Sequence, residues 1–168
     1  MSIVMLSGPV GAGKTAVAQE LMLLSPAPVC YIEGDTFWSF FAKHDGRDPR
    51  ERFRLIMRSM TAAAVPMARG GYEVILDFSI PPQFLDTARK IVKELPLDFV
   101  VLRPSIGVCE RRAANRGEGK IIDYAAYRDL YAFFDGAPQH MVSDDEADPR
   151  SLAQRIREGL DQGTFRVR

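Results

Sequence analysis

The sequence predicts an α/β fold in which helices cover both faces of a five-stranded parallel sheet. Short apolar runs alternate with amphipathic, helix-like segments along the whole chain of 168 residues. Apolar runs without polar alternation are typical of strands buried on both faces, as in a parallel sheet. Helices that join successive parallel strands make right-handed crossovers and cover the sheet. The chain length suits one domain, so we expect a single unit over residues 1–168.

Five segments have the composition of buried strands. Each is a short apolar run, and the last gives the weakest signal. The predicted strands cover residues 3–6, 29–32, 74–76, 99–102 and 140–143.

The segments between and after these strands repeat apolar residues every three or four positions, as one face of a helix does. The predicted helices include residues 17–24, 53–67, 84–95, 124–134 and 152–160. Asp48 and Asp148 each precede a proline, a pairing typical of an N-cap followed by the first helical residue. Ser105 and Asp123 are further candidate caps.

Composition limits the classes of partner. Lys plus Arg equals Asp plus Glu at 22 each, so the formal net charge is zero, and nucleic acid is not an expected partner. No apolar stretch approaches the roughly 20 residues of a membrane helix, and no basic leader is visible. We therefore expect a cytoplasmic protein without membrane contact. Cys30 and Cys109 lie among apolar residues, which favours buried free thiols over a disulfide.

Residues 8–15 read GPVGAGKT and match GxxxxGK[ST], between a predicted strand and a predicted helix. The glycines let backbone amides turn inward around phosphate oxygens, and the helix N-terminus adds a partial positive charge. Lys14 can reach the β- and γ-phosphates, and the Thr15 hydroxyl can ligate Mg²⁺. This P-loop predicts ATP, or another nucleoside triphosphate, and Mg²⁺ as ligands. The expected nucleotide-binding residues are Gly8, Gly11, Ala12, Gly13, Lys14, Thr15 and Ala16.

Two aspartates follow predicted strands, where ligands of parallel sheets bind. Asp35 follows the second strand and Gly34, which frees the backbone; it can accept the proton of an acceptor hydroxyl, cap the next helix, or do both. Asp77 ends an apolar run in a Walker-B-like pattern and can hold Mg²⁺. Trp38 and Phe78 are candidates for stacking on an acceptor, although core packing is an open alternative.

Arginines form two further clusters. Arg112 and Arg116 are four residues apart, so we expect them on one helix face, where they can stabilise a transferring phosphoryl group. Arg50, Arg54 and Arg58 repeat at the same interval and can bind an acidic acceptor. A solvated basic surface remains an alternative for both clusters.

The segments GPVGAGKT, YIEGDTFW, VILDFS and CERRAANRG together resemble the small P-loop kinases, a group with gluconate kinase, shikimate kinase, chloramphenicol phosphotransferase and zeta-toxin-like kinases. They are also similar to AAA-type ATP-binding, kinase-like proteins. The resemblance implies a three-layer P-loop NTPase fold with sheet order 2-3-1-4-5. It also implies Asp35 as the base, and Arg112 and Arg116 as lid arginines facing the phosphates, with Arg112 among the nucleotide-binding residues. We expect a short lid at about 112–123 and an acceptor region at about 35–69. Residues 36–60 do not match the gluconate, shikimate or chloramphenicol binding pattern.

The leading prediction is an ATP- and Mg²⁺-dependent phosphotransferase that moves the γ-phosphate to a hydroxyl of a small molecule. One alternative acceptor is a nucleotide, a nucleotide sugar or a polynucleotide 5′-hydroxyl. A second alternative is an ATP-binding switch or ATPase without an acceptor. The expected partners are thus a nucleoside triphosphate and a small acceptor, for a monomer or a homodimer.

Overall fold

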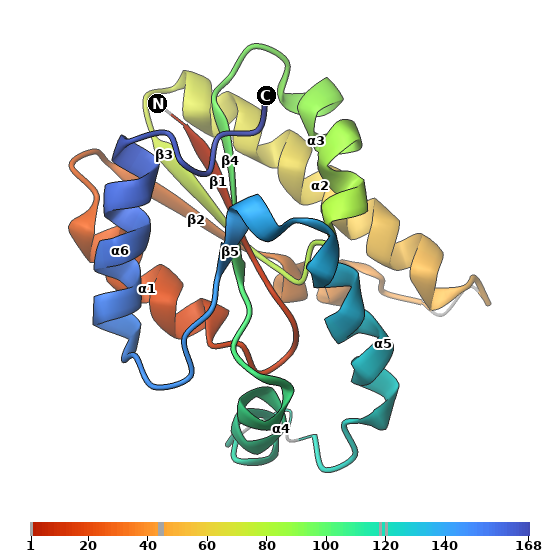
Figure 1. Cartoon of the computed structure of the whole chain (residues 1–168). Coiled ribbons are helices and arrows are strands. Elements are labelled where there is room, and N and C mark those ends of the chain that lie inside the picture. The colour runs from red at the N-terminus through yellow and green to blue at the C-terminus, as the bar shows by residue number, and fades with distance from the viewer. Residues whose placement is uncertain (1, 44–45, 118, 120) are drawn as a thin grey trace.

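A parallel sheet forms the centre of the molecule (Figure 1). The computed structural model describes residues 2–43, 46–117, 119 and 121–168, and within them five parallel strands pair in the order β2-β3-β1-β4-β5. The strands are β1 (Ile3–Ser7), β2 (Val29–Glu33), β3 (Glu73–Asp77), β4 (Leu97–Leu102) and β5 (Met141–Val142). All five predicted strands and the predicted order are confirmed.

Burial of the strands follows their place in the sheet. Every residue of β1, β3 and β4 is buried, because each of these strands has a neighbour on both sides and helices above and below. The edge strand β2 is half-buried throughout. Both cysteines are free thiols, as expected, but only Cys109 is buried, and Cys30 is half-buried because it lies on β2. The expectation of a fully buried Cys30 is therefore wrong.

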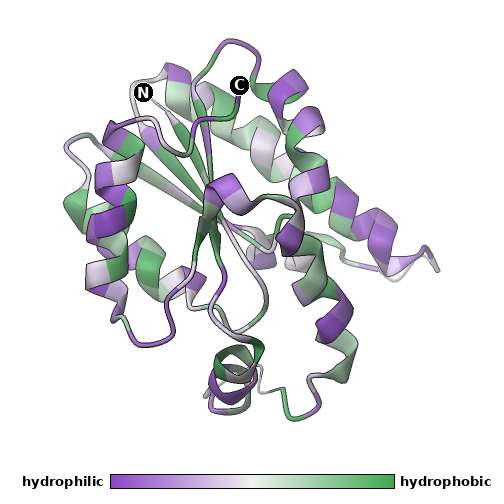
Figure 2. Cartoon of the chain, in the orientation of Figure 1, coloured by the Kyte–Doolittle hydropathy of each residue, from purple (hydrophilic) through white to green (hydrophobic). Residues whose placement is uncertain are grey.

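Helices cover both faces of the sheet (Figure 1). One apolar layer packs α1 (Lys14–Leu24) and α6 (Pro149–Asp161) against the sheet. The other packs α2 (Pro49–Arg69), α3 (Leu85–Val92) and the end of α5 (Ala125–Phe133) against the opposite face. Figure 2 shows hydrophobic strands between helices that alternate apolar and polar stripes. Within the described ranges no helix is long and apolar enough to cross a membrane.

The remaining elements lie at the carboxyl-terminal edge of the sheet or connect the helices. They are α4 (Ile106–Ala114) and four 3-10 helices, η1 (Gly34–Phe40), η2 (Pro82–Phe84), η3 (Phe134–Gly136) and η4 (Pro138–His140).

Helix ends agree with the predicted caps in part. Asp48 and Asp148 cap α2 and α6 through hydrogen bonds from backbone amides of the first turn. Ser105 occupies the N-cap position of α4, but its side chain makes no capping bond. Asp123 accepts a hydrogen bond from the amide of Ala125 at 2.9 Å, one residue before the N-cap position. The third helix is shorter than predicted, because Lys93 adopts φ 56 and ends it at Val92.

His140 is a buried titratable group outside the candidate site. Its side chain is 6% exposed and packs edge-on against Phe99, with 5.6 Å between ring centroids. Its Nδ1 atom has no hydrogen-bond partner among the described residues. Burial lowers the pKa of His140 from its ordinary value of 6.5, so the folded protein binds a proton at this imidazole less readily than the unfolded chain does.

We expect the free energy of unfolding to fall as the pH drops below 6.5. Below that pH the unfolded chain binds a proton at His140 more readily than the folded chain does, and each unit of pKa difference changes stability by about 1.4 kcal/mol. Urea unfolding at pH 7.5 and pH 5.5 measures this loss, which should shrink in a His140→Gln variant. An equal loss in both proteins contradicts the assignment to His140.

Candidate functional site

A cavity of about 440 Å³ lies at the carboxyl ends of β1, β2 and β3, the edge at which parallel sheets bind ligands. The P-loop, η1, α2, the segment after β3, residues beyond the end of α4, and α5 supply its walls. Most of the predicted site residues line it: Gly13, Lys14, Thr15, Ala16, Asp35, Trp38, Asp77, Phe78 and Arg116.

The remaining P-loop residues shape the loop from behind. Gly8 has φ 142 and Gly11 has φ 82, and both are buried outside the cavity lining. A Cβ atom at Gly8 would lie 2.2 Å from the carbonyl oxygen of Leu102, and one at Gly11 would lie 2.2 Å from that of Cys109. Because backbone atoms cannot give way cheaply, only glycine lets the loop pack this closely against β4 and α4. Ala12 is also buried in this layer.

Asp77 and Thr15 form the center of the predicted magnesium site. The Thr15 hydroxyl donates to Asp77 Oδ2 at 2.8 Å, and the Tyr31 hydroxyl donates to the same oxygen at 2.9 Å. Hydroxyl and carboxylate oxygens are the ligands that Mg²⁺ prefers, and it keeps several waters besides. Groups of three or more His, Cys, Asp or Glu that could hold a metal are absent from the described part of the chain. The pair thus fits Mg²⁺ completed by water and phosphate.

Tyr31 is a site residue that the sequence analysis missed. It lies on β2 beside β3, and burial, followed by the charge of Asp77, raises its pKa. The phenol therefore remains a hydrogen-bond donor that orients the Asp77 carboxylate. Tyrosine is common in the apolar strands of a protein core, so the sequence around Tyr31 does not indicate a functional role.

Lys14 points back across the loop. Its Nζ donates to the carbonyl oxygens of Gly8 and Pro9 at 3.2 and 3.1 Å, and to the Ser79 hydroxyl at 3.1 Å. Burial lowers the pKa of Lys14, and the charges of Asp77 and Asp35 act in the opposite direction. Ser79 is a second site residue that was not predicted. Its place in the sequence could have indicated it, because it is a polar residue two positions after the strand-end Asp77.

Three carboxylates, those of Glu33, Asp35 and Asp77, line the same cavity as Lys14. Asp35 is exposed in the first turn of η1 and is not its cap, because Glu33 holds the N-cap position. Glu33 lies opposite Asp77 in the strand register. Burial raises the pKa of Glu33, and the charges of Asp77 and Asp35 add to the effect. Of the three carboxylates, only Asp35 is exposed.

Aromatic side chains form part of the cavity wall. Phe78 is 5% exposed and stacks on Phe53, with 4.9 Å between ring centroids. A Cβ atom at Gly34 would lie 2.4 Å from the Phe78 ring, and φ at Gly34 is not positive. Gly34 is therefore required for space against Phe78, and not for backbone freedom as predicted. Trp38 is 37% exposed, so part of its ring remains accessible beside Asp35.

The two predicted lid arginines separate in the structure. Arg112 lies on α4 and its Nη1 donates to the carbonyl oxygen of Ala12 at 3.3 Å, outside the cavity lining. Arg116 lines the cavity but lies beyond α4, which ends at Ala114. The prediction of one shared helix face is wrong, because it assumed that the helix continues through Arg116.

Beyond Arg116, described residues contact the P-loop and line the cavity. Ile121 lines it, and the Tyr124 hydroxyl donates to the Val10 carbonyl oxygen at 2.6 Å, which ties the start of α5 to the P-loop. Residues 118 and 120 of the predicted lid lie outside the described residues.

Arg54 and Arg58 do not join the predicted site. Both are exposed on α2 and line a second cavity, of about 450 Å³. The structure therefore separates them from Lys14, Asp35 and the other residues of the first cavity.

The chain is similar in sequence to a known protein family. Residues 1–160 match the model of a family described as chloramphenicol phosphotransferase-like protein. No curated protein matches the chain in sequence.

Solved structures share the fold at low identity. A Janibacter sugar kinase superposes with a TM-score of 0.72 at 20% identity, over 96% of this chain and 95% of the other. The tunicamycin resistance protein of Deinococcus radiodurans gives 0.73 at 19%, over 99% and 98%. An APS kinase of Mycobacterium tuberculosis in complex with AMPPNP and APS gives 0.71 at 18%, over 95% and 97%. The predicted resemblance to the small P-loop kinases and their three-layer fold is confirmed.

Proposed function

The chain belongs to the chloramphenicol phosphotransferase-like family, and we propose that it is an ATP- and Mg²⁺-dependent phosphotransferase acting on a hydroxyl of a small molecule. One observation carries the proposal: Lys14 of the P-loop and the exposed carboxylate of Asp35 line the same cavity. A triphosphate tail held by the loop and an acceptor hydroxyl beside Asp35 would therefore meet in one space.

Binding of the nucleotide follows from the loop. Its inward-facing amides and the N-terminus of α1 supply partial positive charge for the β- and γ-phosphates, and Lys14 supplies a full charge. Thr15 and Asp77, with Tyr31 behind them, would hold Mg²⁺. The ion would neutralise charge that develops on the phosphate oxygens.

In the transfer step Asp35 takes the proton of the acceptor hydroxyl. The hydroxyl oxygen forms a bond to the γ-phosphorus, the bond from that phosphorus to the β,γ-bridging oxygen breaks, and ADP leaves. Arg116 lines the cavity and can stabilise charge on the transferring group. Arg112, bonded to the Ala12 carbonyl, supports the loop from outside the lining.

The cavity walls favour a small acceptor. Trp38, Phe53, Phe78, Tyr127 and Leu130 present apolar surface around the polar centre. Such walls suit a small molecule with an apolar body that orients one hydroxyl toward Asp35.

Asp35→Asn is expected to preserve ATP affinity and to lower phosphoryl transfer by a factor of about 10² to 10⁴, since the amide cannot accept the proton. Isothermal titration with AMPPNP and Mg²⁺ measures binding, and ADP release with a screened acceptor measures transfer. Asp86→Asn, at an exposed carboxylate on α3, is the matched control. Full transfer activity in Asp35→Asn rules this residue out as the base.

The same assay separates the alternatives. A switch or ATPase would release ADP at its full rate without any acceptor, whereas a phosphotransferase should need one. A polynucleotide kinase would label 5′-hydroxyl oligonucleotides in preference to small alcohols.

A further inference from the structure

We propose that the acceptor carries an acidic group, a carboxylate or a phosphate, and that the second cavity binds this group through Arg54 and Arg58. The inference rests on the proposed phosphotransferase function and adds the chemical class of its acceptor.

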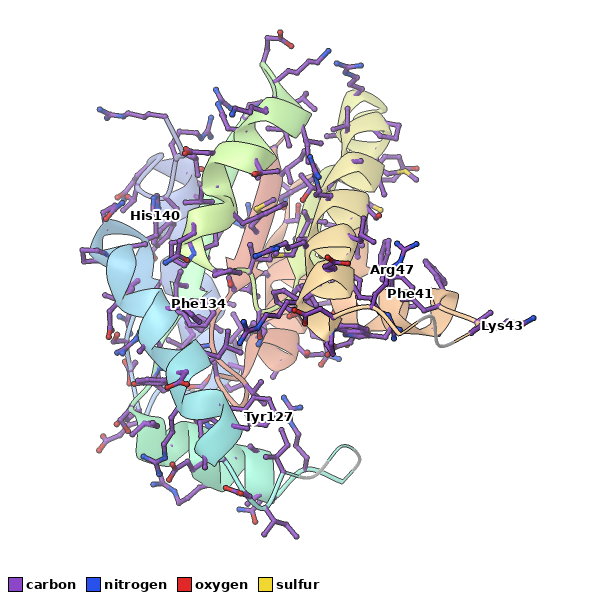
Figure 3. The ribbon with its side chains drawn as sticks, turned by 90° about the vertical axis from the view of Figure 1, so that its right-hand side faces the viewer. Phe41, Lys43, Arg47, Tyr127, Phe134 and His140 are labelled. Carbon is purple, nitrogen blue, oxygen red and sulfur yellow. The ribbon has the colours of Figure 1, made fainter. Side chains whose placement is uncertain are left out.

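The two cavities are neighbours along the same three segments. On α2, Phe53 lines the first cavity and Arg54 lines the second. On α5, Leu130 lines the first and Phe133, one turn further, lines the second. Figure 3 views the molecule from the side on which α2, α3 and α5 face the reader.

The segment after β3 makes the third shared wall. Ser79 lines the first cavity, and Pro81, two residues later, lines the second. Because all three walls pass from one cavity to the next within one helical turn or less, a single elongated molecule can reach both. Its hydroxyl would lie beside Asp35 and its far end beside the two arginines.

Charge in the second cavity is of one sign. Arg54 and Arg58 lie one turn apart on α2, and the lining of the second cavity contains no carboxylate. Neither guanidinium pairs with an acid among the described residues, whereas Arg157 and Arg166 elsewhere in the chain do. In a protein of zero formal charge, this leaves two arginines without counter-charge in one hollow. The N–H donors of two guanidinium groups can form hydrogen bonds with the oxygens of a carboxylate or phosphate.

The rest of the lining describes the body of the ligand. Met57 and Phe84 form a buried apolar floor, and Phe133, which is 51% exposed, presents apolar surface at the rim. The occupant should thus combine a hydroxyl at one end, an apolar centre and an acid at the other end.

Ligand-observed NMR titration with matched probes tests the inference. The probes are 4-(hydroxymethyl)phenylacetate, its neutral amide and 4-(hydroxymethyl)benzyl phosphate, each added to the protein with Mg²⁺ and AMPPNP. We expect at least one acidic probe to bind about tenfold more tightly than the amide, a factor typical of a charge-assisted hydrogen bond. The better of the two acids identifies the acidic group.

Arg54→Gln/Arg58→Gln should remove this preference and leave affinity for the amide and for AMPPNP unchanged. Arg50→Gln is the matched control, because Arg50 is exposed on the same helix but does not line the cavity. Equal binding of acids and amide in the unmodified protein, or an equal loss in Arg50→Gln, overturns the inference. Retained AMPPNP binding in either case leaves the proposed function standing, whereas failure to bind AMPPNP contradicts that function separately.

Discussion

Replacing Lys14 with alanine is expected to weaken ATP binding by a factor of about 100 or more. The ammonium group can donate to both the β- and γ-phosphates, and two charge-assisted hydrogen bonds together contribute roughly 3 kcal/mol. Its hydrogen bonds within the protein go to two P-loop carbonyls and to Ser79, all at the site. Burial lowers the pKa of Lys14, so its charge is held there at a cost to the folded state.

The Lys14→Ala variant should therefore remain folded, and its melting temperature should match or exceed that of the parent protein. Calorimetric titration with ATP and Mg²⁺ measures the affinity, and circular dichroism checks the fold. Lys90→Ala, on the exposed side of α3, removes the same charge away from the site. Unchanged ATP affinity in a folded Lys14→Ala protein is incompatible with the proposed function.

Replacing Glu73 with alanine is expected to lower the free energy of unfolding by about 3–5 kcal/mol. Both Glu73 carboxylate oxygens accept hydrogen bonds from Arg157, each at 2.8 Å, and the two side chains are only 9% and 12% exposed. Burial raises the pKa of the Glu73 carboxyl group. Hydrogen bonds from Arg157 and Ser25 lower it by more, so the pKa lies below its ordinary value. The variant removes the hydrogen-bonding partner of the mostly buried Arg157 side chain between β3 and α6.

Equilibrium unfolding in urea measures the loss of stability. Arg155→Ala breaks an exposed ion pair with Asp144 and should cost less than about 1 kcal/mol. The double variant Glu73→Leu/Arg157→Met removes both charges and should recover most of the stability. A loss below about 1 kcal/mol in Glu73→Ala would show that the pair does not hold α6 to the sheet.

Much of the fold was predictable because its signals are local. Each strand is a contiguous apolar run, and the P-loop is a contiguous motif between a strand and a helix. The positions of Asp35 and Asp77 were also predictable, because residues at the carboxyl ends of parallel strands meet at one edge of the sheet.

Predictions that depended on where a helix ends were less reliable. Arg112 and Arg116 have helical spacing, but α4 stops between them, and only Arg116 lines the first cavity. Arg54 and Arg58 do share a helix, but the packing of α2 places them in the lining of the second cavity. Spacing along a helix specifies a shared face, but the packing of that helix decides what the face meets.

By itself, the sequence determined the α/β class, the five strands, the phosphate loop and the two strand-end aspartates, because each depends on residues that are adjacent in the chain. Only the tertiary structure decided that Tyr31 orients Asp77, that Ser79 contacts Lys14 and that Gly34 makes room for Phe78. Those contacts join residues from 44 to 65 positions apart in sequence, and such pairings arise only when the strands assemble side by side into the sheet.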